Sequence, residues 1–206
     1  MTNNQETAQF LFNGKLVDCR VLYSEDVIQS RVKELAEQIS LDYAGKELIL
    51  IAVLSGGKPF AEDLLYAIAK TASITSILFA SIKVSSYTGT ESTGRLNWEQ
   101  KLSIHPSYLN RDILLVEDIV DTASTLTEIL KTLKEQLQGK AKSIKCISLL
   151  DKPARRLPQH VNFKPDYLGF ELTGAPFVVG YGLDYEQTGR ELRYIIEIPE
   201  ELYAHT

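Results

Sequence analysis

Three nearly continuous apolar runs constrain the fold of this chain more than any other feature: Glu47–Leu54, Asp112–Val116 and Ser143–Leu150. Runs of this length are typical of strands that are buried on both faces, as in a parallel sheet. Segments with apolar residues at helical spacing follow the first two runs, over residues 61–69 and 126–137. Strands that alternate with helices predict an α/β fold with a central, mostly parallel sheet.

Other segments predict the remaining elements around this sheet. A helix is expected after Ser24, whose side chain suits an N-cap, with apolar residues along one face of residues 28–39. A further strand is expected over Ile74–Val84. Short strand-like segments predict a small cap on one edge of the sheet, at residues 167–170, 177–181 and 193–198.

The polar stretch from Ser85 to Asn110 has no clear period and contains the single tryptophan, Trp98. Such a segment inside a compact domain is usually functional or mobile. A strand pair that extends beyond the main sheet is the alternative, and the sequence does not separate the two.

Charge and composition limit the kinds of partner that this chain can be expected to bind. With 22 basic and 27 acidic residues, a net charge of −5, the chain has no overall field that attracts phosphate backbones, and we expect no nucleic-acid partner. The longest apolar run, Leu48–Leu54, is far shorter than the roughly 20 residues that span a bilayer. The N-terminus shows no leader pattern, and Cys19 and Cys146 form no CxxC pair. We expect a cytoplasmic protein, residues 1–206 forming a single domain without a membrane partner.

The segment from Val116 to Thr125, VEDIVDTAST, is the most informative for function. In open parallel sheets, ligands bind at the carboxyl ends of the strands, and this segment directly follows a predicted strand. The free N–H groups at the start of the next helix, together with the hydroxyls of Thr122, Ser124 and Thr125, suit a phosphate group.

The acids of the same segment admit two interpretations. Glu117 and Asp118 suit ribose hydroxyls, or Mg²⁺ bound directly or through water. The alternative is an ordinary helix start, capped by Asp121 or Thr122, in which the helix dipole favours the acids.

VEDIVDTAST resembles the phosphoribosyl-pyrophosphate (PRPP) motif of type I phosphoribosyltransferases, in the form of the hypoxanthine–guanine branch. Other segments resemble the same branch in the same order: LSGGKPFAEDLL its pyrophosphate loop, Ser86-Tyr87 its mobile loop, LLDKPARR its lysine after the fourth strand, and KPDYLGFEL with FVVGYGLDYEQTGR its base-binding cap. The resemblance covers residues 21–198. It implies the type I phosphoribosyltransferase fold, with a core over about 24–152, a hood from the N-terminal segment and about 153–206, and a mobile loop.

The resemblance also implies a reaction, the transfer of a 5-phosphoribosyl group from PRPP to hypoxanthine or guanine with Mg²⁺. Breaking the bond at the anomeric carbon builds positive charge on the ribose, and the leaving pyrophosphate gains negative charge. By similarity, Asp121 is the general base at purine N7, while Glu117 and Asp118 hold the ribose hydroxyls and a magnesium ion. The 5′-phosphate is held by Thr122, Ala123, Ser124 and Thr125.

The purine is expected at the cap. By similarity, Lys152 donates to O6 of the base, which distinguishes hypoxanthine and guanine from adenine. Phe177 stacks on the ring, the backbone of Val178 reads its edge, and Asp184 holds a second magnesium ion. From the residue types alone, a surface lysine is the commoner interpretation of Lys152, and plain core packing is an equal alternative for Phe177.

The pyrophosphate end is implied in the same way. The family's pyrophosphate loop, which often has a cis peptide outside proline, corresponds to Leu54, Ser55 and Gly56. Arg190 pairs with pyrophosphate, for which a planar bidentate donor is apt. Ser86 and Tyr87 close over the reacting centre and exclude water.

Two residues depart from the family pattern. Ser55 stands where many relatives have lysine, which removes one cation near pyrophosphate. Ala123 stands where relatives usually have glycine. A negative φ there leaves phosphate binding intact, whereas a positive φ costs stability or loosens the loop.

Two other functions stay open at this point. A regulatory protein of the same fold would bind PRPP or nucleotides and control transcription or RNA, but the chain retains Asp121 and Lys152. A related transferase for adenine or a pyrimidine is the other alternative; Lys152 and Phe177 argue against adenine, because a buried lysine needs an acceptor such as O6. The sequence does not decide among hypoxanthine, guanine and xanthine, nor between a homodimer and a homotetramer.

Overall fold

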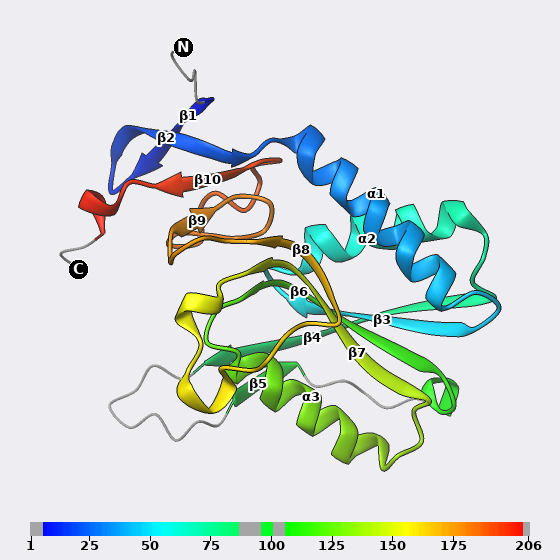
Figure 1. Cartoon of the computed structure of the whole chain (residues 1–206). Coiled ribbons are helices and arrows are strands. Elements are labelled where there is room, and N and C mark those ends of the chain that lie inside the picture. Colours follow the sequence, from blue (N-terminus) through cyan, green and yellow to red (C-terminus); the bar gives the residue numbers. More distant parts are fainter. Residues whose placement is uncertain (1–5, 87–95, 101–105, 204–206) are drawn as a thin grey trace.

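The structure, a computed structural model, describes residues 6–86, 96–100 and 106–203. In that part of the chain the strands form two sheets, a central one and a smaller one at its end (Figure 1). The central sheet has six strands in the spatial order β5 (Leu96–Gln100), β4 (Ser76–Ser86), β3 (Glu47–Leu54), β6 (Asp112–Val120), β7 (Ser143–Asp151) and β8 (Tyr167–Glu171). β4, β3, β6, β7 and β8 pair in parallel, and β5 pairs antiparallel with β4. The predicted α/β fold with a mostly parallel sheet is confirmed.

Helices cover both faces of this sheet. The described residues include α1 (Glu25–Asp42), α2 (Lys58–Thr71) and α3 (Ser124–Leu137). Figure 1 shows α1 and α2 on one face and α3 on the other. Side chains alternate along β3, so that Leu48 and Leu50 pack in the cluster of α1 and α2, whereas Ile49 and Ile51 pack in the cluster of α3. The strand is buried on both faces, as its continuous apolar sequence predicts.

The helix starts match the sequence in two cases out of three. The side chain of Ser24 caps α1 by accepting the N–H of Val27 at 3.4 Å, and α2 carries Pro59 in its first turn. The expected cap of α3 by Asp121 or Thr122 is wrong. Its N-cap is Ala123, which lies in the left-handed region (φ 67°) and makes no side-chain cap bond.

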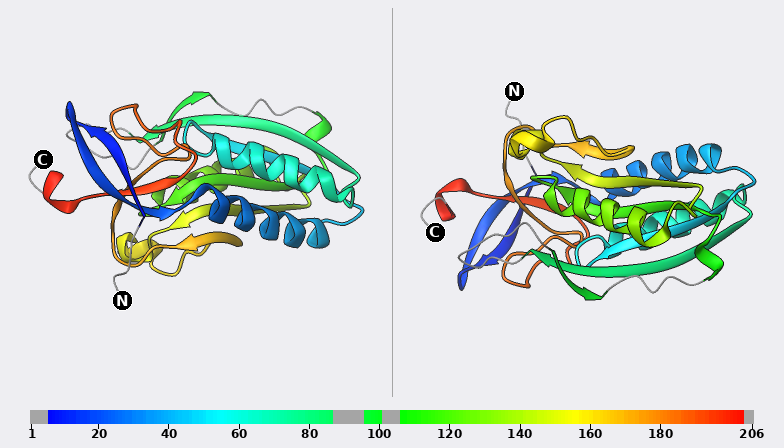
Figure 2. Two further views of the ribbon diagram at one scale, coloured as in Figure 1. Left: turned by 90° about the horizontal axis from the view of Figure 1, so that it is seen from above. Right: turned by 90° about the horizontal axis from the view of Figure 1, so that it is seen from below.

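The smaller sheet is the hood. Its strands lie in the order β1 (Thr7–Phe12), β2 (Lys15–Tyr23), β10 (Ile195–Ile198) and β9 (Phe177–Val179), all antiparallel. β1 and β2 form a hairpin through Asn13 and Gly14, which both have positive φ, as a tight two-residue turn requires. The two views of Figure 2 show the N-terminal hairpin beside the C-terminal strand β10, at one end of the central sheet.

The polar stretch contributes β5, a strand that extends the sheet beyond β4, and Trp98 packs from it against the α3 cluster. Tyr87 and the rest of the expected mobile loop lie outside the described residues. Single 3₁₀ turns complete the fold: η1 (Pro106–Tyr108), η2 (Pro153–Arg155), η3 (Pro158–His160) and η4 (Glu200–Leu202). Both cysteines are buried and free. Within the described ranges, no helix combines the length and apolar character that crossing a membrane requires.

Candidate functional site

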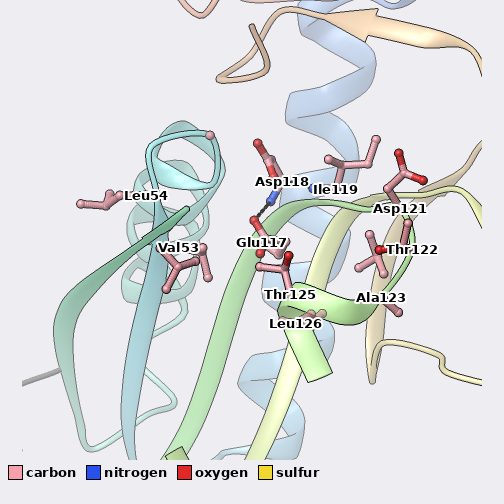
Figure 3. A pocket seen from close by; sticks show the side chains of 13 residues that line it. Val53, Leu54, Glu117, Asp118, Ile119, Asp121, Thr122, Ala123, Thr125 and Leu126 are labelled. Atoms are coloured by element: carbon pink, nitrogen blue, oxygen red, sulfur yellow. Dashed lines mark hydrogen bonds between the residues drawn. The ribbon is translucent and has the colours of Figure 1, made fainter. Parts of the chain in front are cut away.

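The carboxyl ends of β3 and β6 open into a pocket of about 240 Å³ (Figure 3). Eight residues expected from the sequence line it: Leu54, Gly56, Glu117, Asp118, Asp121, Thr122, Ala123 and Thr125. The sequence analysis missed its apolar wall: Val53, Val84, Ile119, Val120 and Leu126. These side chains belong to strand and helix segments that read as ordinary core, so no separate signal marks them.

β6 carries the acidic pair into the sheet. The strand was expected to end at Val116, but it continues to Val120, and Glu117 lies in register with Ser148 of β7. Acids usually end a buried strand, but here they continue it toward a pocket, and for this reason β6 is longer than predicted. Glu117 is 7% exposed as a result.

Burial dominates the electrostatics of this pair. It raises the pKa of Glu117 well above the ordinary value of 4.5, and the neighbouring Asp118 charge adds to the effect. Burial also raises the pKa of Asp118, opposed by the Ile119 N–H, which donates to its Oδ1 at 2.7 Å, and by the charge of Arg190. Two adjacent carboxylates, that of Glu117 buried and that of Asp118 half-buried, form a donor set that suits a hard cation or a pair of hydroxyls.

The described residues contain no cluster of three or more potential metal ligands. Mg²⁺ usually takes one or two carboxylates and completes its shell with water and substrate phosphates. Glu117 and Asp118 are the carboxylates that would hold it here.

The loop after β3 faces the acidic pair. Its Leu54–Ser55 peptide is cis, and Ser55 is exposed. Gly56 is buried against the Asp118 carboxylate, and Gly57 donates its N–H to the carbonyl of Val53 at 3.0 Å. A Cβ at Gly57 would stand 2.7 Å from that same carbonyl oxygen, so Gly57 has no room for a side chain, whereas one at Gly56 would displace the Asp118 carboxylate.

The turn between β6 and α3 forms the other wall. Thr122 and Thr125 line the pocket, and the Ser124 N–H lies 3.4 Å from the Thr122 hydroxyl oxygen. The positive φ of Ala123 settles the question raised by its departure from glycine: the residue adopts the conformation in which a Cβ is costly. The N-terminus of α3 therefore lines the same pocket as the acids, and the N–H groups of a helix start suit an anion.

Asp121 and Lys152 lie side by side at two strand ends. Val120 and Asp151 are register partners in β6 and β7, and Asp121 and Lys152 are the residues that follow them. Lys152 is 8% exposed, and burial lowers the pKa of its ammonium group while the Asp121 charge opposes that change. The alternative interpretation of Lys152, as an ordinary surface lysine, is therefore wrong.

Arg155 was not expected at the site. Its Nε donates to Oδ1 of Asp121 at 3.1 Å, so an arginine holds the proposed base. The sequence contains a signal that could have predicted an arginine at this site, because two arginines follow Lys152 within four residues at the carboxyl end of a strand.

The hood supplies the remaining expected residues. Phe177 is half-buried and contacts the Tyr185 ring edge-on, with 5.9 Å between ring centroids, and Val178 is buried. Arg190 pairs with Asp184, its Nη2 lying 2.7 Å from Oδ1. These four expected residues do not line the pocket of the acidic pair, although the charge of Arg190 acts on Asp118.

The hood loop touches the loop after β3 directly. A Cβ at Gly182 would stand 2.1 Å from the carbonyl oxygen of Gly56, and Arg190 donates to the Gly182 carbonyl at 2.7 Å. The hood therefore sets the position of Arg190 beside the pocket. Ser86 ends β4, and Tyr87 lies outside the described residues.

This fold and this acidic, phosphate-suited pocket define a class of protein. The chain matches the phosphoribosyl transferase domain family over residues 22–186, which is most of its length, and it belongs to that family.

The relatives of this chain indicate which members of the family it is similar to in sequence and structure. The chain is 39% identical to the hypoxanthine-guanine phosphoribosyltransferase of Lactococcus lactis, over 89% of this chain and 93% of the relative. A solved hypoxanthine phosphoribosyltransferase from Staphylococcus aureus is similar with a TM-score of 0.75 and 38% identity, covering 89% of this chain and 93% of that one. The chain also matches the bifunctional protein TilS/HprT of Listeria monocytogenes at 38% identity and spans 26% of that longer relative.

Proposed function

We propose that this protein transfers the 5-phosphoribosyl group of PRPP to hypoxanthine or guanine, giving the purine nucleotide and pyrophosphate. One observation carries the proposal: the acidic pair, the hydroxyl-rich helix start and the glycine loop meet in one pocket of a phosphoribosyltransferase fold. The named relatives support the choice of a 6-oxopurine as acceptor.

The bond between the purine nitrogen and the anomeric carbon forms as the bond from that carbon to the pyrophosphate oxygen breaks. The purine then carries one proton too many, and Asp121 accepts it at N7. Lys152 donates to O6, where its buried ammonium group finds an acceptor. Adenine has an amino group at that position and leaves the ammonium without a partner.

The phosphoribosyl donor lies along the pocket. Glu117 and Asp118 accept from the ribose hydroxyls. The 5′-phosphate is held at the α3 N-terminus by Thr122, Ala123 and Thr125, which line the pocket, and by Ser124 between them. Mg²⁺, when bound, neutralises charge on the pyrophosphate. Leu54, Ser55 and Gly56 donate to pyrophosphate from the backbone.

Four hood residues complete the proposal, although they do not line the pocket of the acidic pair. Arg190 pairs with the pyrophosphate in place of its present partner Asp184, and the Asp184 carboxylate, freed from the guanidinium, holds a second magnesium ion through water. Phe177 stacks on the purine and Val178 reads its edge from the hood. A dimeric or tetrameric assembly and a cytoplasmic location stay predictions.

A spectrophotometric assay with PRPP and Mg²⁺ tests the proposal, with hypoxanthine, guanine, xanthine and adenine offered separately. We expect turnover of hypoxanthine or guanine and none of adenine. PRPP binding without turnover of any base would contradict the transferase proposal and favour a regulatory protein of this fold. Turnover of adenine alone would contradict the role of Lys152.

A further inference from the structure

Arg156 is the most deeply buried arginine side chain among the ion pairs of the described residues, at 3% exposure, and it lies directly behind the proposed purine site. Its guanidinium pairs with the carboxylate of Asp151, whose side chain is 6% exposed. It also lies over the ring of Phe163, 5.8 Å from the centroid. A paired charge at this depth needs several hydrogen bonds to offset its desolvation, so its partners matter.

Those partners are the ends of two strands. Nη1 of Arg156 lies 3.0 Å from the carbonyl oxygen of Val120, 2.5 Å from that of Asp121 and 3.5 Å from that of Lys152. The Lys152 N–H in turn donates to the Val120 carbonyl at 2.9 Å. The Nε of Arg156 is buried without a hydrogen-bond partner among the described residues, so the bonds of this side chain all go to one end of the sheet.

From this geometry we infer that Arg156, held by Asp151, is a positioning residue that fixes the spacing between Asp121 and Lys152. The inference rests on the proposed function. N7, which gives its proton to Asp121, and O6, which accepts from Lys152, lie on the same edge of the purine, so the two side chains must keep one separation. A single guanidinium that holds both backbones sets that separation without touching the substrate.

Lysine does not replace arginine in this place. The guanidinium is a planar fork that reaches carbonyls and a carboxylate at once, whereas an ammonium is a point charge on a flexible stem. Arg156→Lys therefore keeps the charge and loses the geometry. Misplacement of a catalytic group by about 1 Å costs on the order of 10²-fold in rate.

The experiment compares Arg156→Lys with the wild type in three measurements. These are kcat/KM for hypoxanthine, the Kd of IMP, which is the nucleotide product formed from hypoxanthine, and the Kd of PRPP with Mg²⁺. We expect kcat/KM to fall about 10²-fold and IMP binding to weaken, while the Kd of PRPP changes by less than about threefold. The IMP measurement does not depend on turnover. A wild type that binds IMP but turns over no base would overturn the proposed function alone.

Arg31→Lys is the matched control. Arg31 in α1 also donates to backbone carbonyls, those of Leu168 and Gly169 in β8 at 2.9 and 3.0 Å, but it lies away from the pocket. We expect this variant to lose stability and to keep both kcat/KM and IMP binding. Equal effects of the two variants on IMP binding would overturn the inference.

Double-mutant cycles distinguish positioning from general destabilisation. Once Asp121→Asn or Lys152→Met has removed the group that is being positioned, Arg156→Lys should cost less than it does in the wild type. Fully additive losses in both cycles would overturn the inference. Asp151→Asn replaces Arg156→Lys if that variant does not fold. It leaves the hydrogen bonds from Arg156 to the carbonyls and removes the charge that pairs with Arg156. We expect it to weaken IMP binding more than PRPP binding, by a smaller factor than Arg156→Lys does.

Discussion

Gly56 lies against the carboxylate of Asp118 so closely that a Cβ at Gly56 would stand 1.6 Å from Oδ2 of Asp118. The glycine belongs to the loop after β3 and the aspartate to β6, so this contact joins the two strand ends that open into the pocket. Only a residue without a side chain permits it. The loop and the acidic pair are therefore one structural unit.

Gly56→Ala should separate binding from stability. The group that must move is the end of the Asp118 side chain, so the fold accommodates the methyl while the carboxylate turns out of place. We expect the Kd of PRPP with Mg²⁺ to rise by about 10²-fold in calorimetry. Gly14→Ala is the contrast, because Gly14 has φ 75° with no atom within 4 Å: it should cost about 1 kcal/mol of stability and leave PRPP binding unchanged. An unchanged Kd in Gly56→Ala would remove Asp118 from the PRPP site.

Asp121→Asn tests the proposed base. The amide keeps the shape of the side chain and cannot accept the purine proton, so kcat should fall roughly 10²–10⁴-fold. Its hydrogen bond from Arg155 has an amide oxygen to accept it, and PRPP binding should change far less than turnover. Steady-state kinetics with hypoxanthine and calorimetry with PRPP measure the two effects. Near-normal turnover would exclude Asp121 as the base.

Lys152→Met should trade function for stability. Burial lowers the pKa of Lys152, so the unfolded chain holds this proton more tightly than the folded protein does, and the charge destabilises the fold at neutral pH. The variant should therefore unfold at a higher urea concentration than the wild type at pH 7. Its use of 6-oxopurines should weaken far more than its binding of PRPP. A collapse of PRPP binding with unchanged base preference would refute the O6 assignment.

The fold was largely predictable because burial on both faces leaves a plain record in the sequence. The run Glu47–Leu54 forms β3 with the boundaries its apolar residues predict. The spacing of apolar residues also predicts α1 and its cap at Ser24. These features depend on local pattern alone, and a single strand or helix determines each of them.

The candidate site was less predictable where it departs from such patterns. β6 continues through Glu117 because a pocket, rather than bulk solvent, meets the strand end. Ala123 takes a left-handed conformation that its own residue type disfavours, so propensity alone points the wrong way. Arg156 bonds to carbonyls of residues far away in sequence, and only the pairing of β6 with β7 brings them together.

The acidic pair makes stability depend on pH in a defined direction. The pKa of Glu117 is raised in the folded protein. At pH values between about 4.5 and that raised pKa, the folded protein without ligand therefore holds a proton that the unfolded chain has already lost. Below about pH 4.5 both states are protonated and Glu117 contributes little. As the pH rises through the folded-state pKa, the buried charge forms and the free energy of unfolding falls.

Glu117→Gln removes this titration and isolates its effect. We expect the variant and the wild type to unfold at similar urea concentrations near pH 4, and the variant to become increasingly more stable toward pH 7. Glu37→Gln, at an exposed position on α1, should show no such divergence. With PRPP and Mg²⁺ present the order should reverse, because only the wild-type carboxylate gains stability by binding. A constant difference across the pH series would show that folding does not shift the pKa of Glu117.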